Sequence, residues 1–184
     1  TVANMSVSGT VKDGILFATI TEQIVKDAIK AAQNAAKKSG KEADGMAVDF
    51  NVTGSGNYTS LNAAMDAGSI DRLKEAGVKF VKIGSTVLDI TLDTGAIAEL
   101  DSQSTGTVTV SARVRTKLSK AAQALIGSRP VFDLGVNYGA GKTVQDFGAG
   151  SVSVIIPYIL GANETAGNVQ AVYVDANGKA QWLT

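Results

Sequence analysis

ILFATITEQIVKDAIKAAQNAAKKSGKEADGMAVDFNVT, residues 15–53, changes its hydrophobic period twice. Residues 15–20 form an apolar run, which is typical of a buried strand. In residues 24–36 the apolar positions recur every three or four residues, which predicts an amphipathic helix. From Met46 onward apolar and polar residues alternate, which predicts a strand with one buried face. The stretch therefore predicts a helix that packs against a sheet.

The ends of this helix carry separate signals. Its start is marked either by Thr19 with Glu22 three residues later, as in a capping box, or by Thr21 alone. Near its end, basic residues 37–38 precede Gly40, which is typical of a helix C-terminus. We therefore interpret the two lysines as partners of the helix dipole and not as a binding patch.

In the rest of the chain, patterns typical of strands are more frequent than patterns typical of helices. A turn at Lys12-Asp13-Gly14 predicts a hairpin before it, and a second turn at 175–178 predicts a hairpin near the chain end. A further helix is predicted at 117–126. Period-two alternation predicts strands within 46–52, 61–65, 88–92, 108–114, 132–138 and 152–158. We predict an α+β fold of mainly antiparallel sheets packed against one long and two or three short helices.

The domain organisation is predicted from length and composition. The chain has 184 residues, 45% of them hydrophobic, which suffices for a sizeable core. We predict a single α+β domain over 1–184. A subdivision into a helix-containing part, 1–128, and an all-β hairpin part, 129–184, is the alternative.

Two aspartates occupy equivalent places in a weak internal repeat. The pattern apolar-Asp-x-Gly-x-Ile-x-x-Leu occurs at 65–73 and again at 92–100, with Asp66 and Asp93 as its acidic members. A carboxylate pair can serve as general acid and base in glycosidases. Each aspartate, however, directly precedes a predicted helix, where Asp accepts hydrogen bonds from free backbone N–H groups. We therefore assign Asp66 and Asp93 to helix capping and not to catalysis.

Composition excludes several classes of function. The chain has no His and no Cys, which removes Ser-His-Asp and Cys-His nucleophiles and ordinary zinc sites. We predict no enzyme activity, no metal site and no cofactor. Its 17 basic and 17 acidic residues cancel, which argues against a nucleic-acid partner. With no apolar run long enough to span a bilayer, we predict no membrane insertion.

Aromatic side chains are the remaining candidates for a ligand site. Tyr138, Tyr158 and Tyr173 fall in step with apolar strand positions and are expected in the core. Trp182 and Tyr58 are not tied to such a position. They are the residues that we expect to stack on a sugar ring, if the chain binds a glycan.

Much of the chain resembles the modules that precede S-layer homology repeats in surface proteins of Gram-positive bacteria. The resemblance is carried by segments distributed along the sequence: 45–52, 66–77, 118–122, 127–131, 152–158, 168–169 and 172–179. It implies export to the cell surface and attachment to the envelope through neighbouring repeats. It also implies a scaffold or glycan-associated role.

We therefore expect a non-catalytic structural or interaction module of a secreted cell-envelope protein. The alternative is a carbohydrate-binding module for a cell-wall or plant polysaccharide. Expected partners are cell-wall polysaccharide or neighbouring envelope modules. Relatives continue beyond the last hairpin into another strand, which is missing after Thr184, so we also expect an unpaired C-terminal strand edge that permits self-association.

Overall fold

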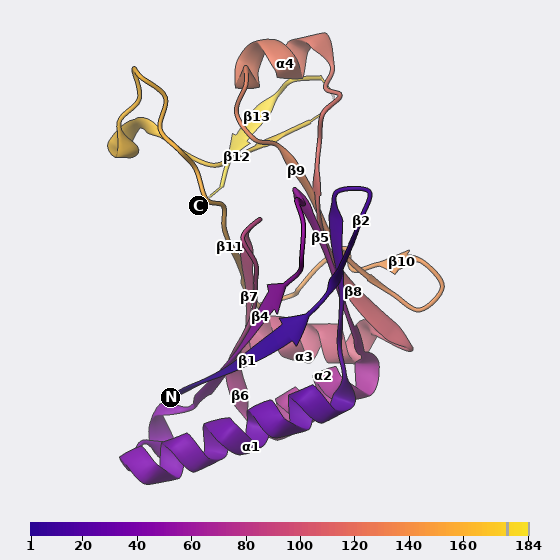
Figure 1. Ribbon diagram of the computed structural model, residues 1–184, viewed down its shortest axis with the longest axis vertical. Coiled ribbons are helices and arrows are strands. Elements are labelled where there is room, and N and C mark those ends of the chain that lie inside the picture. The colour runs from indigo at the N-terminus through magenta and orange to yellow at the C-terminus, as the bar shows by residue number, and fades with distance from the viewer. Residues whose placement is uncertain (176, 184) are drawn as a thin grey trace. The chain divides into compact units, whose positions relative to one another are not determined.

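The computed structural model describes residues 1–175 and 177–183, which Figure 1 colours from indigo to yellow. Contacts between Cα atoms divide the chain into two compact units. The larger unit comprises 1–113 and 134–156, and the smaller unit comprises 114–133 and 157–184. The units interleave along the chain. One domain, or a division after residue 128, stays a prediction.

The described residues form four α-helices and thirteen strands. The helices are α1 (Glu22–Ser39), α2 (Ala67–Glu75), α3 (Thr94–Gln103) and α4 (Lys120–Ile126). The strands are β1 (Val2–Ser8), β2 (Thr10–Lys12), β3 (Ile15–Ile20), β4 (Met46–Thr53), β5 (Ser60–Asp66), β6 (Val78–Gly84), β7 (Asp89–Asp93), β8 (Thr107–Val114), β9 (Phe132–Tyr138), β10 (Lys142–Thr143), β11 (Val152–Ile155), β12 (Val172–Val174) and β13 (Ala180–Trp182). Short 3₁₀ turns lie at Glu42–Asp44 and Ala166–Asn168.

The strands form three sheets. Sheet A has the order β1-β4-β6-β7-β11, sheet B the order β10-β9-β8-β5-β3-β2, and sheet C contains β12 and β13. β1 and β6 both run parallel to β4, and β3 runs parallel to β5. The other registered pairs are antiparallel. The predicted α+β class, with one long and three short helices, is confirmed.

The core of the larger unit lies between one face of sheet A, sheet B and three helices. α1 lies on β1 and β4, and α3 lies on β6 and β7. Figure 1 shows α1, α2 and α3 gathered at one end of this unit. Because side chains alternate along a strand, every second residue faces this core. Fully buried members include Val7, Leu16, Ile20, Val25, Val48, Phe50, Leu61, Leu73, Ile83, Leu88, Ile97 and Leu100.

Capping residues determine where α1 and α4 begin and where α1 ends. α1 begins after Thr21, whose hydroxyl accepts a hydrogen bond from the Ile24 N–H, so the second of the two predicted starts is confirmed. It ends at Gly40, whose φ of 63° is left-handed. The prediction that a helix begins at Lys117 is wrong. α4 begins at Lys120 because Ser119 caps it.

The smaller unit is held together differently from the larger one. Among its described residues only Ala122 is buried. Polar contacts tie its segments instead, since the Glu164 carboxylate accepts hydrogen bonds from Arg129 at 2.7 Å and from the Tyr158 hydroxyl at 2.5 Å. Within the described part of the chain, no helix combines the length and the apolar character needed to cross a bilayer.

Candidate functional site

The two aspartates of the repeat lie at helix N-termini. Asp66 is the N-cap of α2 and accepts a hydrogen bond from the Gly68 N–H at 2.7 Å. Asp93 is the N-cap of α3 and accepts one from the Ala96 N–H at 2.8 Å. That bond, helped by a second from the Ser151 N–H, lowers the pKa of Asp93 below its usual value. Both carboxylates are therefore engaged by backbone.

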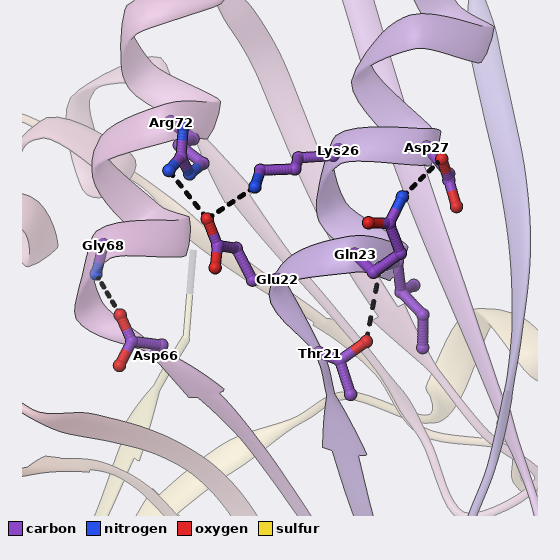
Figure 2. A network of polar contacts seen from close by, with 9 residues as sticks. Thr21, Glu22, Gln23, Lys26, Asp27, Asp66, Gly68 and Arg72 are labelled. Carbon is purple, nitrogen blue, oxygen red and sulfur yellow. Dashed lines mark hydrogen bonds and ion pairs between the residues drawn. The ribbon is translucent and has the colours of Figure 1, made fainter.

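A surface network joins the start of α1 to the last turn of α2 (Figure 2). The Glu22 carboxylate pairs with Lys26 at 2.8 Å and with Arg72 at 2.7 Å. The hydrogen bond from Lys26 is the main reason that the pKa of Glu22 lies below its usual value. The network links two helices at the surface, so its role is structural.

The two aromatic candidates lie in different units, so each is treated as a separate surface. Tyr58 lies in the loop between β4 and β5 and is half-buried, and its hydroxyl accepts a hydrogen bond from Thr86 Oγ1 at 2.9 Å. Trp182 lies in β13 and is 69% exposed. Trp182 therefore offers a free ring face, whereas Tyr58 is partly committed to its own loop.

A surface that the sequence reading did not single out lies on sheet A. We call it the open face: the side chains of sheet A that point away from α1. Three cross-strand rows build it, because registered partners share a face. The rows are Val2, Ala47, Phe80 and Asp93; then Asn4, Asp49, Lys82, Thr91 and Ser153; then Ser6, Asn51, Gly84, Asp89 and Ile155.

The middle of the open face carries a charge cluster. Lys82 Nζ lies 2.6 Å from Asp49 Oδ2 and 3.7 Å from Asp89 Oδ2. Its hydrogen bond to Asp49 raises the pKa of Lys82 above the usual value. Asp49 is only 7% exposed, and its Oδ1 has no hydrogen-bond partner among the described residues. Two carboxylates thus share one ammonium group, and one carboxylate oxygen is left with unused acceptor capacity.

An exposed apolar strip borders this cluster. Phe80 precedes Lys82 by two residues on β6, so both side chains lie on the same side of the sheet. The Phe80 side chain is 50% exposed, and Val2, in the same row, is 56% exposed. The open face therefore sets one aromatic ring beside hydrogen-bonding and charged groups.

The chemistry of the open face favours binding over catalysis. A glycosidase-type pair needs two carboxyl groups on either side of a substrate, one of them protonated. Here Lys82 lies between Asp49 and Asp89 and compensates both. Within the residues that the structure describes, no group of three or more His, Cys, Asp or Glu is arranged to hold a metal ion.

A groove elsewhere on the larger unit lacks paired acids as well. It lies between α1 and α2 and contains a single carboxylate, Glu75, among basic and amide side chains. Its lining comprises Lys26, Ile29, Lys30, Gln33, Arg72, Glu75 and Ala76.

Sequence reasoning had one usable signal for the cluster. Asp49 and Asp89 are charged residues inside the predicted strands 46–52 and 88–92, at the positions that alternate with core residues, whereas no strand was predicted around Lys82. The alternation places both side chains on the solvent-facing side of their strands, but it does not show that the two strands share a neighbour. Only the pairing of β6 with β4 on one side and with β7 on the other places Lys82 between them. The site was therefore missed because neither β6 nor its pairing was predicted.

Comparison of the chain with family models, with characterised proteins and with solved structures found no match. The resemblance to modules of Gram-positive surface proteins thus rests on the sequence segments alone. Function has to be inferred from the topology and surface chemistry of this chain.

Proposed function

We propose that this chain is a non-catalytic structural module of an exported bacterial cell-envelope protein and that its larger unit carries tension along the chain. The observation that carries the proposal is the placement of β1 and β11. These are the first and the last strand of the larger unit along the chain, and they form the two edges of sheet A.

The two edge strands point in the same direction. β1 is parallel to β4, and β4 is parallel to β6. β7 is antiparallel to β6, and β11 is antiparallel to β7, so β11 runs in the same sense as β1. The chain therefore enters sheet A at one end of the strands and leaves it at the other end.

This arrangement loads the sheet in shear. A force applied at Thr1 and at the residue after β11 acts along the strand axes. The hydrogen bonds of a ladder lie across the strands, perpendicular to them in antiparallel pairs and slanted in parallel pairs, and so lie largely across this force. They must then fail together, whereas a force across the strands opens them one after another. Shear therefore slows forced unfolding, which is governed by the unfolding rate.

The two edges differ in the length of their ladders. β1 is in register with β4 over seven residues, from Val2 to Ser8. β11 is in register with β7 over four, from Val152 to Ile155. The pairing of β11 with β7 is consequently the weaker edge, and we expect it to fail first.

Single-molecule force spectroscopy tests this proposal, because the chain has no cysteine and handles can be attached at introduced ones. Handles at Thr1→Cys and Pro157→Cys pull sheet A in shear. Handles at Thr86→Cys and Pro157→Cys pull from one end of the β7 and β11 pair and peel it open. We expect a clearly higher rupture force for the first pair of handles than for the second.

The peeling geometry is a matched control, because it pulls on the same strand, β11, but across the ladder and not along it. Equal rupture forces for the two geometries would remove the basis of the proposal. Export and surface location need their own measurement. Labelling of intact cells with an antibody against the chain is expected to detect it outside, and detection only after lysis would contradict the proposed location.

The second candidate function is carbohydrate binding, and the open face favours it. An aromatic ring that stacks on a sugar, flanked by side chains that exchange hydrogen bonds with hydroxyl groups, is the usual chemistry of such sites. Phe80 supplies a half-exposed ring, and the amide side chains of Asn4 and Asn51 on the same face are exposed. Trp182 is a second and separate platform.

Retention on insoluble polysaccharides, including peptidoglycan-linked polymer, chitin and xylan, tests this candidate. We expect Phe80→Ala to lose retention and Phe17→Ala, which removes another exposed phenylalanine on sheet B, to keep it. Loss with Trp182→Ala alone would move the site to β13. No retention of the unmodified protein on any polymer would dismiss carbohydrate binding.

A further inference from the structure

The outer edge of β1 differs from the other edge of sheet A. β1 has β4 on one side and, among the strands that the structure describes, none on the other. Its sequence, VANMSVS, is uncharged and contains no proline, and its register with β4 is continuous. β11, at the opposite edge, has only four residues and is followed by Pro157 two positions later. Charges, proline, bulges and short length are the usual protections of an edge, and β1 has none of them.

Two hydrogen bonds show which backbone groups of β1 are free. The Ala47 N–H donates to the Thr1 carbonyl, and the Gly9 N–H donates to the Thr53 carbonyl, both at 2.7 Å. Parallel strands bond through alternate residues, so the odd-numbered residues of this segment face β4. The N–H and C=O groups of Val2, Asn4, Ser6 and Ser8 consequently point to the outer edge.

These free groups are self-complementary under a twofold axis. When two β1 strands lie antiparallel with Met5 opposite Met5, Val2 faces Ser8 and Asn4 faces Ser6 in both directions. All four outward-facing residues of each strand then form hydrogen-bonded pairs, so eight backbone hydrogen bonds join the strands. Other registers leave some of these groups without partners.

The same register matches side chains as well as backbone. Residues opposite each other share a face, so Ala3 meets Val7 and Met5 meets Met5 on the core side. On the open face, the polar Asn4 meets the polar Ser6. No charged residue lies in β1, so the pairing brings no like charges together.

We infer that β1 is a homotypic docking edge, at which a second copy of this chain pairs antiparallel and extends sheet A across a twofold axis. The inference does not depend on the proposed tension-bearing function. It also concerns a different edge from the C-terminal one that the sequence predicts. Closed twofold pairing uses the same surface on both copies, so it stops at a dimer.

Cysteine cross-linking tests the register directly. In the inferred pairing, Met5 lies on the axis in a non-hydrogen-bonded pair, where Cα atoms are about 4.5 Å apart, within disulfide range. Val154 on β11 is a matched control, since it is also half-buried and lies on an edge strand of the same sheet. We expect Met5→Cys to form a disulfide-linked dimer at least tenfold faster than Val154→Cys. Equal rates would mean random collision and would overturn the inference.

Sedimentation of the cysteine-free protein gives the second measurement. Ser6→Pro removes an N–H that faces the outer edge and leaves the groups that face β4 in place, whereas Ser6→Ala changes only the side chain. We expect a monomer–dimer equilibrium whose Kd rises at least tenfold in Ser6→Pro and stays unchanged in Ser6→Ala. Circular dichroism monitors folding of both variants, and the cross-linking result stands if Ser6→Pro does not fold.

Two results would overturn the inference. One is an unmodified protein that stays monomeric up to the highest soluble concentration, which would mean that the edge has no affinity for itself. The other is a dimer that persists in folded Ser6→Pro, which would place the interface on another surface.

Discussion

Lys82 holds the least replaceable position on the open face, because Asp49 and Asp89 both depend on it for compensation. Asp49 is the more demanding partner, since it is buried and one of its oxygens already lacks a hydrogen bond among the described residues. A buried carboxylate that loses its cation must stay charged in a poor solvent or take up a proton. The residue therefore matters for stability whether or not the face binds a ligand.

The first prediction concerns Lys82→Met, which keeps the aliphatic stem and removes the charge. We expect the free energy of unfolding at pH 7 to fall by about 1–3 kcal/mol, because a partly buried anion is left unpaired. Urea denaturation followed by circular dichroism measures this change. Lys12→Met, at an exposed lysine on β2, is the control and is expected to change stability by less than about 0.5 kcal/mol.

The pH dependence of Lys82 has a defined sign. Its pKa is raised in the folded protein, so its contribution is fully present below the unfolded pKa of about 10.4 and is lost as pH rises through the folded pKa. The unmodified protein should lose stability in this alkaline range, and Lys82→Met should lose less. If the free energy of unfolding fell equally in the two proteins as the pH rose through this range, the assigned pairing role of Lys82 would be contradicted.

The second prediction concerns Asp93, which caps α3. Asp93→Ala should lower the free energy of unfolding by about 1 kcal/mol, whereas Asp93→Asn should stay close to the unmodified protein at pH 7, because Asn caps as well as Asp. The folded pKa of Asp93 is lowered, so its charge stabilises the fold above the unfolded pKa of about 3.9, and that stability is lost as pH falls.

Denaturation at several pH values measures both effects of Asp93. Asp93→Asn should show a shallower loss of stability below pH 4 than the unmodified protein. If Asp93→Asn were as unstable as Asp93→Ala at pH 7, the charge and not the cap would be the source of the effect.

At the scale of elements, close backbone contact at the start of β11 is as important as the helix caps. A Cβ built on Gly150 would lie 2.0 Å from the Ala96 backbone nitrogen and 2.4 Å from the Gly95 carbonyl carbon. Gly150 therefore lets the segment before β11 touch the first turn of α3. The Asp93 N–H donates to the Ser151 carbonyl at 3.1 Å in the same contact.

The third prediction is that Gly150→Ala separates this segment from α3. We expect a loss of about 1–3 kcal/mol in the free energy of unfolding, the usual cost of forcing extra atoms into a packed site. Gly167→Ala is the control, because a Cβ there meets nothing within 4 Å. Urea denaturation compares the two. If Gly150→Ala left the free energy of unfolding unchanged, the segment before β11 would be able to move away from α3 without loss of stability.

The elements themselves were largely accessible from sequence. The helical period of residues 24–36 and the cap signals around it located α1, because burial of one face and capping both leave local patterns. The start of α4 was misplaced by three residues, since Lys117 and Leu118 fit the helical period but Ser119 caps the helix. Local signals thus specify elements well wherever one signal does not compete with another.

At the scale of the whole molecule, the pairing of strands was not accessible from sequence. β4 and β5 are consecutive strands, yet they lie in different sheets, and β4 pairs instead with β1 and β6. Alternation states which face of a strand is buried but not which strand lies beside it. The parallel edges of sheet A depend on pairing, and the cluster around Lys82 depends on pairing and also on β6, where no strand was predicted. Neither feature was therefore predicted.

The fourth prediction concerns the unequal packing of the two units. The larger unit contains nearly all of the buried side chains, whereas the smaller unit has only Ala122 among its described residues. Segments with few buried apolar contacts open at lower free energy than the core. We therefore expect backbone amides of β12 and β13 to exchange with deuterium much faster than those of β4 and β6.

Hydrogen–deuterium exchange with mass spectrometry measures this difference peptide by peptide. An opening free energy lower by about 3 kcal/mol corresponds to exchange about a hundredfold faster. Peptides over 46–53 and 78–84 should define the slow limit, and peptides over 172–182 should exchange near the fast limit. Equal protection in both regions would show that the hairpin of β12 and β13 opens only with the core of sheet A, so that one cooperative unit spans the chain.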